Sequence, residues 1–357
     1  MSSNVKQSAG FWKRTPAYTP SIVDSNSLTS RFQAILSSNS VDIEQLRKLS
    51  WKGIPDEMRA ASWRLLMGYV PLSSSRQGTT LQRKRKEYVD WKAQTFMRGE
   101  DALDRVLWHQ ISIDVPRTAP GTPLLQYPRL QHSLGRVLYC WAARHPASGY
   151  VQGINDLATP FFHVFLNELP SKNIDQLTDE EMEAVEADSF WCLTKLLDGI
   201  QDNYTHAQPG IQRQLVKMKE LVARIDSKLA KHLDSQGLEF IQFAFRWINC
   251  LLMREMSLSN TVRMWDTYLA EDQGFSAFHI YVCAAFLLRW SKELQTMDFQ
   301  QMLMFLQCPP SVDRWTTKDI ELLLSEAYMY KCLYDSAPSH YTESRNPAAN
   351  TGSASNS

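Results

Sequence analysis

The fold of this chain is decided between Trp108 and Asp156, where two short loops interrupt helical patterns. The loops read Ile113-Asp114-Val115-Pro116-Arg117-Thr118 and Ser148-Gly149-Tyr150-Val151-Gln152-Gly153-Ile154-Asn155-Asp156. Apolar residues before each loop recur at helical spacing, which indicates that each loop follows a helix packed on a core. Polar side chains presented in this way are typical of a site that is held rigidly and directed outward.

A proline sets the end of the first helix. Pro116 cannot donate the next helical hydrogen bond, and it disfavours helical backbone at the residue before it. The helix must therefore stop near Pro116, and Arg117 leaves the helix end.

The second loop also lies between two predicted helices. Pro146 and Gly149 end the helix before it, which places Gln152 in the loop. Asn155 and Asp156 then offer a cap for an apolar helix that begins at Leu157.

Composition indicates an all-α protein. The chain has 357 residues, of which 44% are hydrophobic, and only 14 glycines, which leaves few turns for many short strands. Lys+Arg and Asp+Glu are equal at 38 each, so no overall field attracts nucleic acid or an anionic membrane. Six scattered cysteines without a Cys-x-x-Cys pair predict buried free thiols in a reducing, cytoplasmic compartment.

The pattern of apolar residues predicts one folded region between two disordered ends. Residues 1–28 and 336–357 are poor in apolar side chains and are expected to lack a fold. The folded region, 29–335, divides into an N-terminal lobe of about 29–170 and a C-terminal lobe of about 188–335. The acidic run between these lobes, 171–188, is predicted to be an exposed connector. No stretch is long and apolar enough to predict a transmembrane segment.

The usual catalytic signatures are missing from the sequence. It contains no zinc-binding His-Glu-x-x-His, nucleophile elbow, Walker phosphate loop or dinucleotide glycine fingerprint. What remains is a loop arginine and a loop glutamine, a pair that suits phosphoryl transfer, where catalysis is mainly positioning and charge stabilisation. Because the chain has no nucleotide loop, GTP and Mg²⁺ would come bound to a partner. This describes a GTPase-activating protein that works in trans.

Arg117 by itself also fits a solvated surface residue. Asp114 weighs against that interpretation, because an acid at a helix C-terminus opposes the helix dipole and costs roughly 0.3–1 kcal/mol without a specific partner. Holding the Arg117 loop would supply such a partner.

Two motifs then carry a specific resemblance. The strings Ile111-x-x-Asp114-x-x-Arg117-Thr118 and Tyr150-x-Gln152-Gly153-x-Asn155 match the signature motifs of the TBC (Tre-2/Bub2/Cdc16) domain, the Rab GTPase-activating family. Gly53-Ile54-Pro55, with Arg59 and Trp63 after it, resembles the family's opening motif. Arg263-Met264-Trp265-Asp266 resembles a later motif, which we interpret as structural. The resemblance covers roughly residues 46–334 and is strongest to the TBC domain family member 22 subfamily, related to a yeast Golgi Rab activator.

The resemblance assigns roles to six residues. It implies that Arg117 is the arginine finger and Gln152 the glutamine finger, supported by Asp114, Tyr150, Gly153 and Asn155. It further implies a two-lobed, all-α TBC domain that activates an enzyme and is not itself one. The domain would carry no cofactor of its own, and its partner would be a Rab-family GTPase in the GTP form. Vesicle trafficking at the Golgi follows, with Golgi or adaptor partners binding the terminal segments.

A second class of function stays open. A TBC-fold adaptor would bind Rab or Golgi proteins without useful catalysis, and its terminal segments would be the functional parts. Intact finger residues favour the activator.

Overall fold

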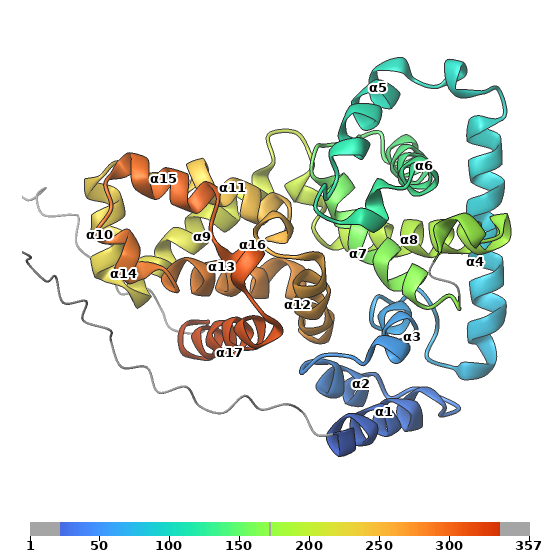
Figure 1. Ribbon diagram of the computed structural model, residues 1–357, viewed down its shortest axis with the longest axis horizontal. Coiled ribbons are helices and arrows are strands. Elements are labelled where there is room, and N and C mark those ends of the chain that lie inside the picture. Colours follow the sequence, from blue (N-terminus) through green and yellow to red (C-terminus); the bar gives the residue numbers. More distant parts are fainter. Residues whose placement is uncertain (1–21, 171–172, 336–357) are drawn as a thin grey trace, which may run out of the picture.

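The computed structural model describes residues 22–170 and 173–335, and no β-strand occurs in this range. The prediction of an all-α fold is confirmed. Figure 1 shows two groups of helices beside each other, α3–α8 in one and α9–α17 in the other, with α1 and α2 at the edge. Among the described residues, no helix is both long enough and apolar enough to cross a membrane.

The first group and the two helices at its edge contain α1 (Ile22–Leu36), α2 (Ile43–Ser50), α3 (Asp56–Leu66), α4 (Ser74–Phe96), α5 (Arg105–Asp114), α6 (Pro128–Arg144), α7 (Ile154–Asn167) and α8 (Asp179–Gly199). Four 3₁₀ turns join them, η1 (Glu100–Ala102), η2 (Val115–Arg117), η3 (Pro123–Gln126) and η4 (Ile174–Gln176). Helix α8 packs against α4, α6 and α7 and so forms the centre of this group.

The second group contains α9 (Pro209–Ile225), α10 (Ser227–Ser235), α11 (Ile241–Asn249), α12 (Leu258–Ala270), α13 (His279–Leu288), α14 (Ser291–Leu294), α15 (Phe299–Gln307), α16 (Ser311–Arg314) and α17 (Thr317–Tyr334). The short turns η5 (Gln201–Asn203) and η6 (Met253–Glu255) and the π-helical turn η7 (Gly274–Phe278) connect them. Helix α13 packs against α9, α11 and α17, and its inner residues are almost all buried.

An aromatic cluster joins the two groups. Trp63 of α3 stacks on Trp265 of α12 with ring centroids 6.1 Å apart, and Phe161 of α7 meets both rings edge on. Beside this cluster, the fully buried carboxylate of Asp266 accepts hydrogen bonds from the Trp63 indole N–H at 2.7 Å and from the backbone N–H of Ile54 at 2.9 Å. The structural interpretation of the Trp265-Asp266 motif is therefore confirmed.

The prediction that residues 171–188 form an exposed connector is wrong from Asp179 onward. Helix α8 begins at Asp179 with a capping box between Thr178 and Glu181, and acidic residues suit the first turn of a helix. Further along α8, Glu186 and Asp188 are fully buried. The acidic composition indicated solvent exposure, but these two carboxylates have partners on neighbouring helices.

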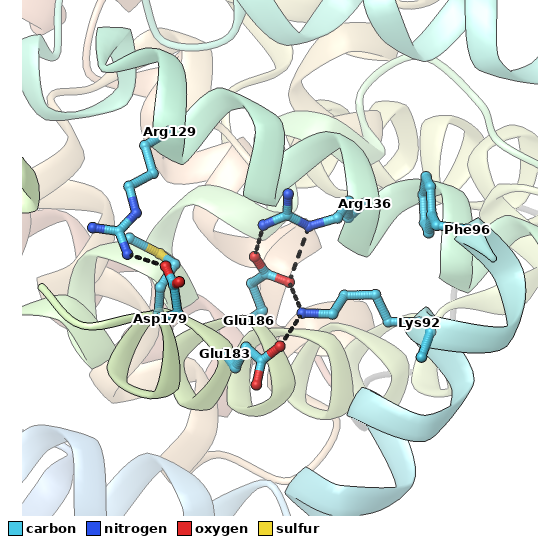
Figure 2. A pocket seen from close by; sticks show the side chains of 9 residues that line it. Lys92, Phe96, Arg129, Arg136, Asp179, Glu183 and Glu186 are labelled. Atoms are coloured by element: carbon cyan, nitrogen blue, oxygen red, sulfur yellow. Dashed lines mark hydrogen bonds and ion pairs between the residues drawn. The ribbon is translucent and has the colours of Figure 1, made fainter. Parts of the chain in front are cut away.

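Basic side chains from three helices neutralise those buried carboxylates. Asp188 lies 2.7 Å from both the Arg64 and the Arg85 guanidinium groups of α3 and α4. Glu186 pairs with Arg136 of α6 and accepts a hydrogen bond from the Tyr88 hydroxyl at 3.0 Å. Figure 2 shows Glu186 between Arg136 and Lys92. Helix α8 thus belongs to the first group, and the predicted start of the second lobe at about 188 falls inside it.

The predicted N-terminal boundary also moves. Helix α1 begins at Ile22, inside the segment 1–28 that was expected to lack a fold. Phe32 of this helix is fully buried, and Leu28 and Ile35 pack against the same core. These contacts stabilise the helix on the N-terminal side of Phe32 as well. The rest of that segment and the predicted disordered tail, 336–357, lie outside the described residues.

The six cysteines are all free, but they are not all buried. Cys140, Cys192, Cys250 and Cys283 are buried as predicted, whereas Cys308 and Cys332 are exposed. Cys308 follows the last residue of α15, and Cys332 lies on the solvent side of α17, so their apolar neighbours in sequence do not cover them.

Candidate functional site

The Arg117 loop begins as predicted. Helix α5 ends at Asp114, and the chain tightens into the 3₁₀ turn η2, whose last residue is Arg117. Val115 still donates to the Ile111 carbonyl, whereas Pro116 has no N–H to continue the helical ladder. The Arg117 side chain is exposed and makes no hydrogen bond or ion pair with any described residue.

The Gln152 loop ends differently from the sequence prediction. Helix α7 begins at Ile154 with Gly153 as its N-cap, so Asn155 and Asp156 lie in the first turn and do not cap a helix from Leu157. The Asn155 side chain turns back to accept from the Gly153 backbone N–H at 2.9 Å. Gln152 is exposed directly before this cap, and its side chain makes no hydrogen bond with any other described residue.

One buried hydroxyl joins the two loops. The Tyr150 oxygen lies 2.9 Å from Asp114 Oδ2 and 3.1 Å from Asn155 Oδ1, and its single proton is donated to one of these acceptors at a time. Burial, together with the negative charge of Asp114, raises the pKa of Tyr150, so the hydroxyl keeps its proton. The sequence analysis expected Asp114 to hold the Arg117 loop, but its side chain instead accepts from Tyr150, which ties the other loop to the end of α5.

Thr118 completes the connection. Its hydroxyl donates to the Asp114 backbone carbonyl at 2.9 Å and accepts from Asn155 Nδ2 at 2.9 Å. Thr118 is 1% exposed, so this bond lies inside the protein. The sequence analysis quoted Thr118 in its motif but gave it no role. The signal was its place directly after Arg117, since a hydroxyl there bonds back to the preceding turn.

A third segment, contributed by the second group of helices, supports the Gln152 loop. Asn249 Nδ2 donates to the Gln152 backbone carbonyl at 3.0 Å, and Arg254 Nε lies 2.9 Å from Asp156 Oδ2. Burial raises the pKa of Asp156, and the charge of Arg254 opposes that rise. The sequence analysis missed Asn249 and Arg254 because no local pattern connects residues that lie 97 and 98 positions away along the chain.

The predicted supporting residues are thus brought together. Asp114, Tyr150, Gly153 and Asn155 form one buried network, with Arg117 and Gln152 exposed at its two borders. This arrangement can hold a cation and a carboxamide at the surface of a rigid support. The catalytic roles of these six residues stay predictions.

The described residues offer no group of three His, Cys, Asp or Glu side chains that could hold a metal ion. A second candidate site is the pocket of Figure 2, between α4, α6 and α8, which is lined by Lys92, Arg129, Arg136, Asp179, Glu183 and Glu186. Lys92 lies 2.8 Å from Glu183, and Arg129 lies 2.8 Å from Asp179. Because these lining charges neutralise one another, we assign no ligand to this pocket.

The fold and the two loops define a class of protein. Residues 56–295 match the Rab-GTPase-TBC domain, and the chain belongs to this family. The predicted family resemblance is confirmed.

Individual relatives agree with this assignment. The chain is 54% identical over 331 residues to the GTPase-activating protein gyp1 of Schizosaccharomyces pombe, covering 89% of this chain and 64% of that protein. It is 49% identical over 328 residues to human TBC1 domain family member 22B, covering 90% of this chain and 65% of that protein. The chain therefore spans just under two thirds of the length of these relatives.

Two solved structures share the fold. The crystal structure of the Ypt/Rab-GAP domain of Gyp1p has a TM-score of 0.81 at 52% identity, covering 87% of this chain and 99% of that chain. The Chlamydomonas flagellar RabGAP TBC domain has a TM-score of 0.63 at 19% identity, covering 86% of this chain and 92% of that chain, and it supports the fold alone.

Proposed function

We propose that this protein accelerates GTP hydrolysis by a Rab-family GTPase, to which it supplies Arg117 and Gln152 in trans. The names of its relatives support the activity, since the Schizosaccharomyces pombe protein is called a GTPase-activating protein. The GTPase would bind in its GTP form and bring both nucleotide and Mg²⁺.

One observation carries the proposal. Arg117 and Gln152 are exposed and without a partner in the described part of the chain, yet the loops beneath them share a buried network of side chains. A long polar side chain without a partner is common on a surface. Two of them on loops joined by the Tyr150 hydroxyl are a preorganised pair, which reduces the cost of orienting them during the reaction.

The planar guanidinium of Arg117 suits the charge that develops on phosphate oxygens during hydrolysis. It presents several donors in a fixed fork. An arginine supplied in this way is worth about 10³-fold or more in rate. Arg117 also needs no release from an internal ion pair before it reaches the partner.

The carboxamide of Gln152 combines an acceptor with two donors. It accepts a hydrogen bond from the attacking water through its oxygen and donates to a phosphate oxygen through its nitrogen. Both contacts together fix the water in line with the phosphate. In a Ras-type GTPase this task belongs to the GTPase's own glutamine.

Single-turnover GTP hydrolysis across a panel of purified Rab proteins tests the proposal. We expect the wild-type protein to stimulate at least one Rab, and Arg117→Ala to remove most of this stimulation at unchanged thermal stability. Arg117→Lys should fail as well, because a point charge does not reproduce the guanidinium fork. If several Rab proteins bind but none is stimulated, the protein is an adaptor and the proposal is wrong.

The proposal also covers where in the cell the protein acts and in which process. The relation to the member 22 subfamily favours vesicle trafficking, with cytoplasmic protein recruited peripherally to the Golgi, where segments outside 22–335 contact membrane or adaptor proteins. Imaging of the tagged full chain together with Golgi markers tests this extension. Exclusion of the tagged chain from the Golgi would contradict it.

A further inference from the structure

We infer that Asn249 is a positioning residue, which holds the Gln152 backbone in the place that catalysis needs. The inference rests on the function proposed above and adds a residue that neither loop motif contains. Asn249 ends α11 in the second group of helices, whereas Gln152 precedes α7 in the first.

The contact is a buried hydrogen bond from the Asn249 side chain to the Gln152 backbone. Asn249 Nδ2 donates to the Gln152 carbonyl oxygen at 3.0 Å, and Asn249 is 6% exposed. The other side-chain atom, Asn249 Oδ1, is buried and has no hydrogen-bond partner among the described residues. If the Asn249 amide were flipped, its Oδ1 would face the Gln152 carbonyl oxygen, and two acceptors cannot form a hydrogen bond. The contact therefore fixes the orientation of the Asn249 amide.

Asn249 is held firmly on its own side. The Tyr204 hydroxyl donates to the Asn249 backbone carbonyl at 2.7 Å. The next residues, Leu251 and Leu252, are fully buried and have φ values of +49° and +59°. Non-glycine residues in this left-handed region are strained and occur where the surroundings impose them, often at functional sites.

The lack of a side chain at Gly153 leaves room for Asn249 beside the Gln152 loop. A Cβ atom at Gly153 would lie 2.4 Å from Asn249 Nδ2 and 3.2 Å from Cys250 Sγ. Its φ of +111° is also a conformation that favours glycine. The glycine of the Gln152 motif is therefore explained by the close approach of Asn249 as well as by the turn.

A second contact fixes the same junction. Arg254 Nη2 lies 2.8 Å from the carboxylate of Asp156, in the first turn of α7. The segment from Asn249 to Arg254 thus attaches to both sides of Gly153. Tyr150 positions Gln152 from the first group of helices, and Asn249 positions it from the second.

The test is Asn249→Asp, which keeps the shape of the side chain but replaces the donor with an acceptor. In single-turnover assays with the Rab that responds most strongly, we expect the maximal rate to fall about 10- to 100-fold, the scale of an ångström-sized misplacement. The protein concentration that gives half-maximal rate should stay the same, because the residues that meet the GTPase are unchanged.

Asn260→Asp is the matched control. Asn260 is 4% exposed, and its Nδ2 donates to the Trp315 backbone carbonyl at 2.9 Å, so the variant removes the same type of bond in the same group of helices. We expect a comparable loss of resistance to denaturant and an unchanged maximal rate. If Asn249→Asp does not fold, Asn249→Ala removes the donor without adding a charge and carries the same expectations.

A double-mutant cycle decides whether Asn249 acts through Gln152. Asn249→Asp should have no further effect in a Gln152→Ala background, and it should keep its full effect in an Arg117→Ala background. An equal loss in both backgrounds, or a wild-type rate for Asn249→Asp, would overturn the inference. If Gln152→Ala is slow while Asn249→Asp is not, only the inference fails. A wild-type rate for Gln152→Ala removes the proposed glutamine role together with the inference.

Discussion

The Tyr150 hydroxyl contacts Asp114 at the end of α5 and Asn155 after the Gln152 loop. Tyr150→Phe keeps the ring but leaves Asp114 Oδ2 without this donor in a buried position. We expect the free energy of unfolding to fall by about 1–3 kcal/mol and the stimulated GTP hydrolysis to fall about tenfold or more. Denaturant unfolding and single-turnover kinetics measure the two effects.

Tyr88→Phe is the control for this substitution. The Tyr88 hydroxyl also donates to a buried carboxylate, that of Glu186, at 3.0 Å, but it lies in the interior of the first group between α4 and α8. We expect a similar loss of stability and an unchanged rate per folded molecule. Equal rates for both tyrosine variants and wild type would contradict a role for Tyr150 in holding the site.

Gly153 is needed for two possible reasons: the space beside Asn249 and the positive φ of the backbone. Two substitutions separate these reasons. Gly153→Ala should lower the stimulated rate about tenfold or more, because the new Cβ displaces Asn249 and the loop. Gly99→Ala is its control, since Gly99 also has a positive φ, +79°, but no atom within 4 Å of the added Cβ. We expect Gly99→Ala to reduce stability and leave the rate unchanged; a Gly153→Ala rate equal to that of Gly99→Ala would oppose this account.

The sequence predicted those supporting residues that lie close to the fingers along the chain. Asp114 was singled out because an acid at a helix C-terminus needs a partner, and Tyr150 through its motif. Their mutual hydrogen bond could not be derived, because it depends on how α5 and the α6–α7 loop meet in space. No sequence pattern pointed to Asn249, since its contact with Gln152 exists only after the two groups of helices have packed.

At the scale of elements, α8 shows how composition can mislead. Its acidic residues predicted an exposed connector, but Asp188 accepts from Tyr69 and pairs with Arg64 and Arg85. The partner side chains on neighbouring helices distinguish such a helix from a solvated one. Helix periodicity did predict α6, the helix before the Gln152 loop, because burial along it follows the apolar spacing.

That burial makes a quantitative prediction for α8. Asp188→Asn leaves two guanidinium groups without their buried carboxylate and should lower the free energy of unfolding by about 3–5 kcal/mol. Glu183→Gln on the same helix removes an ion pair whose acid is 37% exposed and should cost less than about 1 kcal/mol. Denaturant unfolding of both variants measures the difference. If both variants lose the same small amount of unfolding free energy, the buried acid of α8 does not stabilise the fold.

At the scale of the molecule, the core and the candidate site both lie between residues 22 and 335. A chain trimmed to 22–335 should therefore keep a helical circular dichroism spectrum, cooperative unfolding and full stimulation of GTP hydrolysis. Loss of stimulation by the trimmed chain at unchanged folding would mean that a terminal segment takes part in catalysis or in Rab binding.

The candidate site draws on both groups of helices. Arg117 and Gln152 belong to the first group, but Asn249 and Arg254 come from the second, and the cluster of Trp63, Phe161 and Trp265 joins the groups.

We propose that Gln152 takes over the water-orienting task from the GTPase. The most direct test compares wild type and Gln152→Ala, each with a responsive Rab and with the same Rab after its catalytic glutamine is changed to leucine. We predict strong loss of stimulation with Gln152→Ala and substantial stimulation of the leucine Rab by the wild-type protein, with non-additive effects. If the leucine Rab is not stimulated while Gln152→Ala is as active as wild type, Gln152 only stabilises its loop and the two-finger account is wrong.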